Sequence, residues 1–129
     1  MNKILVEVSV GELLDKISIL EIKQEKIKDS EKLRFINDEH SILKDQLNSN
    51  VKSDQKLTEL FESLKQINAK LWGIEDNKRQ CEKEKDFKDT FIKLSRDVHF
   101  LNDDRAKIKL KINNHTGSKI KEIKEYTSY

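Results

Sequence analysis

The sequence predicts an all-α protein, an antiparallel helical bundle of about four helices, with two short helices followed by two long ones. Three observations support this fold class. Proline is absent and glycine occurs only three times in 129 residues, whereas strands and tight turns usually need both. Apolar residues recur three and four positions apart along most of the chain, which is the period of an amphipathic helix. Residues that favour helix N-caps interrupt this period at intervals.

The first eight residues are expected to form an extended arm or a short strand. Ile4, Val6 and Val8 share one side of an alternating pattern. A lone strand is not stable in water, so this segment needs a partner, either the C-terminal tail or another protomer.

The first helix is expected to begin after Ser9. Ser9 and Glu12 fit a capping box. In this motif the Ser9 side chain accepts a hydrogen bond from a backbone N–H in the first turn, and the Glu12 side chain reaches back to the backbone N–H of Ser9. The stripe of this helix, meaning the line of residues three and four positions apart that is expected to face the core, contains Leu13, Ile17, Leu20, Gln24 and Ile27.

The second helix is expected to begin at Asp29 and Ser30, which end the first helix and are suited to cap the N-terminus of the next. Its stripe contains Leu33, Ile36, His40, Leu43 and Leu47. The polar segment Asn48–Ser53 predicts a loop.

The third helix is expected to begin at Ser53 or Asp54 and to be long. Gly73 lies inside it beside Trp72, and we expect this glycine to permit a close helix contact. The stripe contains Leu57, Leu60, Leu64, Ile67, Leu71, Ile74, Lys78 and Cys81.

The fourth helix is expected to be capped by Asp86 and to end near Gly117. Its stripe contains Phe87, Phe91, Leu94, Val98, Leu101, Arg105, Ile108 and Ile112. The short connection predicts a coiled-coil-like hairpin that turns near Lys85. Residues 118–129 are expected to form a flexible or docked tail, and residues 1–129 a single helical domain.

The composition predicts a narrow core or one shared with a second copy. Charged residues make up 39% and hydrophobic residues 35% of the chain. An average domain is about 25% charged and about 45–50% apolar. A homodimer or a protein partner is therefore expected. The formal net charge is only +2, so nucleic acid is an unlikely partner, although residues 105–125 are locally basic.

Several classes of protein are not indicated by the sequence. No run approaches the ~20 apolar residues of a membrane span, and the first residues lack the apolar run of a signal peptide, so we expect the cytoplasm. Cys81 is the only cysteine, which excludes an internal disulfide. No metal-ligand spacing, phosphate loop or catalytic motif occurs, and no metal or cofactor is expected.

Arg105 is the polar residue whose position in a stripe is hardest to explain. Its charge is effectively permanent, so at a buried contact between two helices it needs a carboxylate or an anionic ligand beside it. Polar residues on neighbouring helical faces suggest either a small-anion pocket or a salt-bridge network that holds the helices in register. The candidate ligand-binding residues are Lys16, Glu21, Lys23, Trp72, Glu75, Asp76, Asn102, Arg105 and Lys109.

Three blocks of the chain resemble an uncharacterised family of short bacterial proteins, classed as a domain of unknown function. They are VSVGELLDKISILEIK at 8–23, LWGIED at 71–76 and NDDRAKIKLKINNHTGS at 102–118. The blocks include Asp15 and Asp103 as well as all nine candidate residues, which adds weight to the pocket alternative. The resemblance implies no activity, since the family has none established. The lysine- and isoleucine-rich composition suggests a bacterial or phage genome.

Three functions remain in competition at this point. The first is a non-enzymatic interaction or scaffold protein, dimeric, that uses its helix faces or N-terminal arm. The second is a small-anion-binding protein or enzyme that uses the polar cluster between helices. The third, ranked last, is nucleic-acid binding through the basic C-terminal region.

Overall fold

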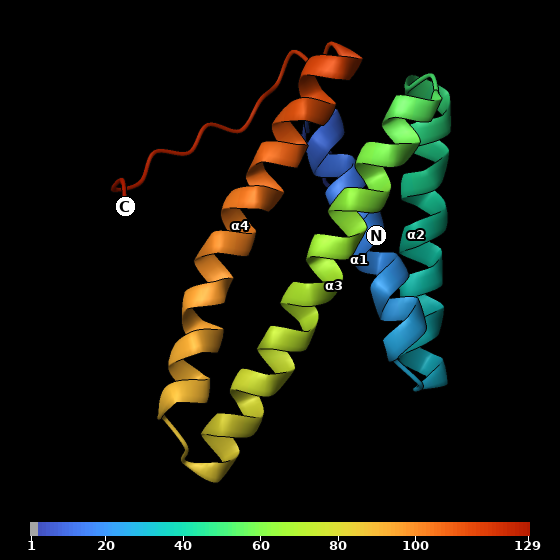
Figure 1. The fold of residues 1–129 in the computed structure, drawn as a ribbon. Coiled ribbons are helices and arrows are strands. Elements are labelled where there is room, and N and C mark those ends of the chain that lie inside the picture. Colours follow the sequence, from blue (N-terminus) through green and yellow to red (C-terminus); the bar gives the residue numbers. More distant parts are fainter. Residues whose placement is uncertain (1–2) are drawn as a thin grey trace.

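The computed structural model describes residues 3–129, and the helices within them confirm the all-α class (Figure 1). The helices are α1 Val10–Lys26, α2 Ser30–Asn50, α3 Gln55–Glu84 and α4 Asp89–Thr116. As predicted, the two longest, of 30 and 28 residues, follow the two shorter ones. No strand occurs within 3–129, so the strand alternative for the N-terminal segment is wrong there, and residues 3–9 form an extended arm. The predicted arm also included residues 1–2, which lie outside the described residues.

Helix α1 is the central helix of the fold. It packs against α2, α3 and α4, and in Figure 1 α2 and α4 lie on opposite sides of it. Because α1 has neighbours on several sides, it buries more than the single stripe that its sequence predicted. Leu14 and Ile22, which lie off that stripe, are as fully buried as Ile17 and Leu20 on it.

The hydrophobic core lies where α1 packs against α3 and α4. It consists of Leu14, Ile17, Leu57, Leu60, Leu64 and Ile112. Leu43 and Leu47 of α2 pack against this core from outside. The predicted stripe of α2 is confirmed as its half-buried face, but no residue of α2 is fully buried, because this helix packs only along α1.

Helices α3 and α4 form the predicted antiparallel hairpin. Figure 1 shows them diverging from their shared turn toward the far end, where α1 packs against both. Lys85 makes the turn with a positive φ of 56°. The prediction that Asp86 caps α4 is wrong: its carboxylate accepts the Lys88 N–H at 3.2 Å, and the helix begins only at Asp89. Because Lys85 adopts the left-handed conformation, the chain makes a short turn over the next residues before it returns to helical geometry at Asp89.

Most of the predicted helix ends are confirmed. Gly117 ends α4 in the left-handed conformation, with φ 69°. Three predicted N-caps accept a backbone N–H three residues later through their side chains: Ser9, Asp29 and Asp54. The predicted loop Asn48–Ser53 is shorter than expected, because α2 continues to Asn50. There the Asn50 side chain bonds the carbonyl oxygen of Gln46, at 2.8 Å, and supports the last turn.

The C-terminal tail runs back along α4 in an extended conformation. The Lys121 ammonium donates to the Asn114 side chain at 2.8 Å, and the Tyr129 hydroxyl contacts Asp103. The ring of Tyr129 packs edge-on against Phe100 at a centroid distance of 5.3 Å. Ile123, Tyr126 and Tyr129 of the tail nevertheless stay 83%, 75% and 77% exposed, and the choice between a flexible and a docked tail stays a prediction.

Candidate functional site

The start of α1 lies unusually close to the end of α4. The backbone N–H of Gly11 donates to the Asn113 side-chain oxygen at 2.7 Å, and both residues are buried. A Cβ atom on Gly11 would stand 2.7 Å from the backbone oxygen of Lys109, closer than such atoms approach in proteins. Glycine is therefore required here for the two backbones to meet. This contact also fixes the position of Asp15, one turn further along α1.

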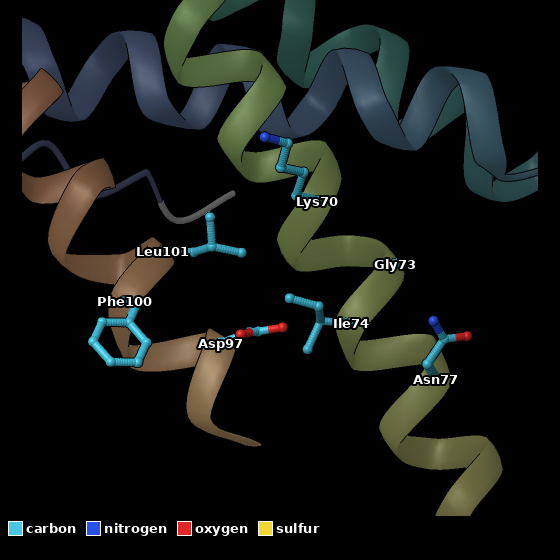
Figure 2. A pocket seen from close by; sticks show the side chains of 7 residues that line it. All are labelled: Lys70, Gly73, Ile74, Asn77, Asp97, Phe100 and Leu101. Carbon is cyan, nitrogen blue, oxygen red and sulfur yellow. The ribbon is translucent and has the colours of Figure 1, made fainter. Parts of the chain in front are cut away.

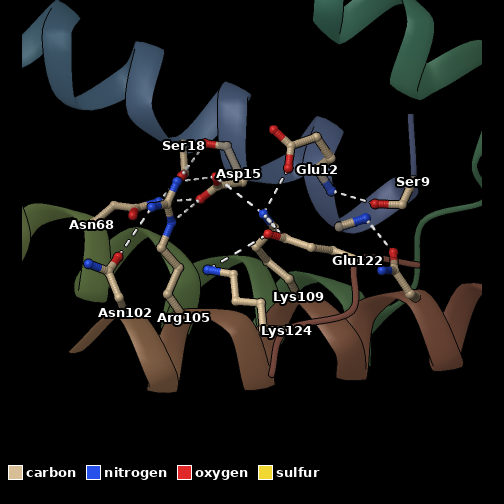
Figure 3. Close-up of polar contacts among 12 residues, drawn as sticks. Ser9, Glu12, Asp15, Ser18, Asn68, Asn102, Arg105, Lys109, Glu122 and Lys124 are labelled. Carbon is tan, nitrogen blue, oxygen red and sulfur yellow. Dashed lines mark hydrogen bonds and ion pairs between the residues drawn. The ribbon is translucent and has the colours of Figure 1, made fainter. Parts of the chain in front are cut away.

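Asp15 is the centre of a buried polar network that joins three helices (Figure 3). Arg105 of α4 donates to it through two nitrogens, with an Nε–Oδ1 distance of 3.0 Å. Asn68 of α3 donates to the same carboxylate at 2.8 Å and to the Ser18 hydroxyl at 2.8 Å. The bond with Asp15 raises the pKa of Arg105 above its ordinary value. The network therefore holds a permanent ion pair between α1 and α4, supported by α3.

Lys109 forms the second half of this network. Its ammonium donates to Glu12 at 2.7 Å and to Glu122 of the tail at 2.8 Å. Burial lowers the pKa of Lys109, but these two hydrogen bonds, together with the negative charges of Asp15 and Glu12, outweigh burial and raise the pKa above its usual value. The predicted capping box is therefore only half correct. Ser9 accepts the Glu12 N–H, while the Glu12 carboxylate turns to Lys109.

The polar network is saturated by groups of the chain itself. Within residues 3–129, every buried side-chain nitrogen or oxygen has a hydrogen-bond partner. Both cations of the network, the half-buried Arg105 and the buried Lys109, face carboxylates of the same chain. An external anion would have to displace one of these carboxylates, so the arrangement acts as a clamp between helices.

The structure brings together only part of the predicted candidate set. Asn102, Arg105 and Lys109 lie in the network, where Asn102 accepts a bond from Arg105 at 3.4 Å. The other candidates, none of which makes the network's hydrogen bonds, are Lys16, Glu21, Lys23, Trp72, Glu75 and Asp76. Lys16, Glu75 and Asp76 are exposed, and Lys23 and Trp72 are half-buried.

Glu21 belongs to a separate contact between α1, α2 and α3. It lies 3.1 Å from His40 and 3.4 Å from the ammonium of Lys65. Close by, the Gln24 side chain donates to Asn37 at 2.9 Å. Gln24 and His40, two polar residues that interrupt the predicted stripes, thus each bond a polar residue of the other helix, Asn37 and Glu21 respectively.

Sequence analysis missed several members of the network. Asn68 follows Leu57, Leu60 and Leu64 at helical spacing, so its position in the core could have been found. Glu122 lies in a segment without periodicity, and nothing in the sequence indicates its contact with Lys109. Gly11 also gave no signal, because its role depends on a helix about a hundred residues away.

An open groove lies between the turn-proximal halves of α3 and α4 (Figure 2). Its volume is about 460 Å³, and its lining residues are Lys70, Gly73, Ile74, Asn77, Asp97, Phe100 and Leu101. Ile74 of α3 faces Asp97 and Leu101 of α4 across it. The expectation that Gly73 permits a close helix contact is wrong, because a Cβ atom there would meet nothing within 4 Å.

Residues 3–129 contain neither a cluster suited to a metal ion nor a helix suited to crossing a membrane. No group of three or more His, Cys, Asp or Glu residues comes together in a way that could hold a metal ion. None of the helices combines the length and the apolar character that a membrane crossing requires.

Comparison with known proteins yields one match. The model of a family described as "Family of unknown function (DUF6165)" matches residues 4–129. No curated protein and no solved structure matches the chain.

Proposed function

The chain therefore belongs to the DUF6165 family, whose function is unknown, and we propose that it is a non-enzymatic interaction module that binds a protein partner in the α3–α4 groove. The observation that carries this proposal is the groove itself. It is open to solvent, yet the apolar side chains of Ile74 and Leu101 line it, with Phe100 at its edge.

The position of the groove in the fold supports a docking role. The core residues of α3 and α4 lie in the halves that α1 covers, away from the shared turn. The groove lies in the other halves, where Ile92 is exposed and Phe100 is covered in part by the Tyr129 ring of the tail. Apolar surface that remains open on a rigid scaffold commonly marks an interaction site. We expect the module to be dimeric and to act in the cytoplasm.

The polar network supports this proposal over the anion-binding alternative. An anion site needs cations that lack an internal partner, whereas Arg105 and Lys109 are paired with Asp15, Glu12 and Glu122. A clamp of this kind keeps α1 fixed against the far ends of α3 and α4. Because α1 is fixed there, it does not cover the ends of α3 and α4 that lie near their shared turn, and these ends are available to a partner.

The experiment that tests the proposal is photo-crosslinking in cells from position 73. Replacing Gly73 by a photo-reactive phenylalanine analogue puts the probe into open space inside the groove. The matched control is the same analogue at Phe35, which is 63% exposed on α2. We expect one defined protein adduct from position 73 and none from position 35. Absence of an adduct from position 73 would refute the proposal.

A further inference from the structure

We infer that the occupant of the α3–α4 groove is the N-terminal arm of a second copy of this chain. This inference rests on the proposed function, since it names the partner for the same groove. The arm, residues 3–9, is rich in apolar residues that no other part of the same chain covers within residues 3–129. Ile4, Leu5 and Val6 are 86%, 82% and 75% exposed, and they form the longest apolar run near the start of the chain.

The size and chemistry of the arm fit the groove. In an extended chain Ile4, Val6 and Val8 share one side, so three branched apolar side chains enter together. On α3 the groove extends from Lys70 to Asn77, or about 10 Å at the helical rise. The arm from residue 4 to residue 8 spans about 13 Å when extended.

Charge complementarity sets the direction of the arm. The groove carries two charged residues, Asp97 nearer the turn and Lys70 further from it. Asp97 also accepts a hydrogen bond from the exposed Lys93 at 2.7 Å, a surface pair that an incoming lysine can share or replace. The arm also carries two, Lys3 and Glu7, one near each end. Both lie on the side of the arm opposite Ile4, Val6 and Val8, so their long side chains meet the groove charges at its rim and not at its floor. Opposite charges meet at both ends only when Lys3 lies by Asp97 and Glu7 lies by Lys70. In this direction the arm leaves the groove on the side away from the hairpin turn.

The reach of the arm requires that it come from another chain. The start of α1 is tied to Asn113, and Leu101 lies twelve residues before Asn113 on α4, about 18 Å away along the helix. The arm measured from Ser9 reaches about 17 Å to Ile4 and about 10 Å to Val6. Within one chain, only the tip of the arm could touch the near end of the groove. A second copy is free of this limit, and each copy can fill the other's groove.

The first test uses single cysteines on two different chains. One chain carries Val6→Cys and the other Gly73→Cys, both in a Cys81→Ala background that removes the native thiol. The two are mixed and oxidised, and the products are identified by mass. We expect a disulfide-linked heterodimer, and none when Phe35→Cys replaces Gly73→Cys. Equal yields from the two mixtures would overturn the inference. So would a chain with both Val6→Cys and Gly73→Cys that links only to itself.

The second test is charge reversal with rescue, measured as the dimer dissociation constant by sedimentation equilibrium. Lys70→Glu places like charges beside Glu7 in both grooves and is expected to weaken dimerisation by roughly threefold or more. Adding Glu7→Lys on the same chain should restore the wild-type constant. Circular dichroism checks that each variant folds, and both positions are exposed. A double variant as weak as Lys70→Glu alone would overturn the inference.

The photo-crosslinking experiment separates failure of this inference from failure of the proposed function. An adduct of twice the chain mass, linked from position 73 to residues 3–8, is the result expected here. An adduct with a different protein overturns the inference and leaves the groove as an interaction site. Absence of any adduct overturns both.

Discussion

The Arg105 guanidinium on α4 is hydrogen-bonded to the Asp15 carboxylate on α1 through two of its nitrogens, across ninety positions of sequence. The two partners differ in their access to water. The side chain of Asp15 is 2% exposed, whereas that of Arg105 is 27% exposed. Removal of one partner therefore has a different consequence from removal of the other.

We predict that Arg105→Ala lowers the free energy of unfolding by about 3 kcal/mol, because the buried Asp15 carboxylate then keeps only Lys109, 3.9 Å away, as a counter-charge. Asp15→Ala should cost less, since the remaining guanidinium can turn toward water. Replacing both residues by apolar ones, as in Asp15→Leu with Arg105→Met, should cost less than Arg105→Ala alone. Urea unfolding followed by circular dichroism measures all three. If Arg105→Ala folds with unchanged stability, the network is not the clamp described here.

Two glycines in helices should respond in opposite ways to alanine. Gly11→Ala is expected to destabilise the protein, because the new Cβ would lie 2.7 Å from the backbone oxygen of Lys109. Gly73→Ala is expected to stabilise it by about 0.5–1 kcal/mol, since the Cβ meets open space and alanine favours the helix. Thermal unfolding of both variants under the same conditions checks the pair. A shift of the two melting temperatures in the same direction would contradict it.

Acidification should release the tail from α4. The hydrogen bond from Lys109 holds the pKa of Glu122 below its ordinary value of 4.5. The folded state therefore favours the carboxylate, and this contribution is complete above pH 4.5. It disappears as the pH falls through the lower pKa of the folded state. Carbon-13 NMR of the Glu122 carboxyl group, with backbone relaxation of residues 118–129, should show both events together. In Glu122→Gln the mobility of the tail should no longer change over this range.

The core and the outer helix should differ in their tolerance of truncation. Leu64 is fully buried among α1, α3 and α4, so Leu64→Ala is expected to lower the free energy of unfolding by about 2–5 kcal/mol. Phe35 on α2 is exposed, so Phe35→Ala should change it by less than about 0.5 kcal/mol. Equilibrium unfolding in urea provides both values. A large loss for Phe35→Ala would indicate that α2 is covered by something in solution.

The sequence predicted the helices more reliably than the contacts between them. The stripe of α2 and the N-caps Ser9, Asp29 and Asp54 were all found, because each depends on residues a few positions apart. The start of α4 was missed because the turn uses a left-handed residue, Lys85, which is not glycine. Nothing local distinguishes this lysine from its neighbours.

The candidate site was predicted in part for the same reason. Helical spacing placed Asn102, Arg105 and Lys109 on one face of α4, and the structure brings them together. Spacing within one helix does not tell which face of another helix it meets. Glu75 and Asp76 therefore appeared to be neighbours of Arg105, although both are exposed.

The sequence by itself determined the fold class, the order and approximate length of the helices, and the need of Arg105 for an anionic partner. These follow from periodicity, caps and the cost of burying a charge, which are properties of short segments and single side chains. Only the tertiary structure decided that α1 is the central helix, that Asp15 is the partner and that the α3–α4 groove stays open. These depend on the close approach of Gly11 to α4, which sets where α1 lies and therefore what it covers.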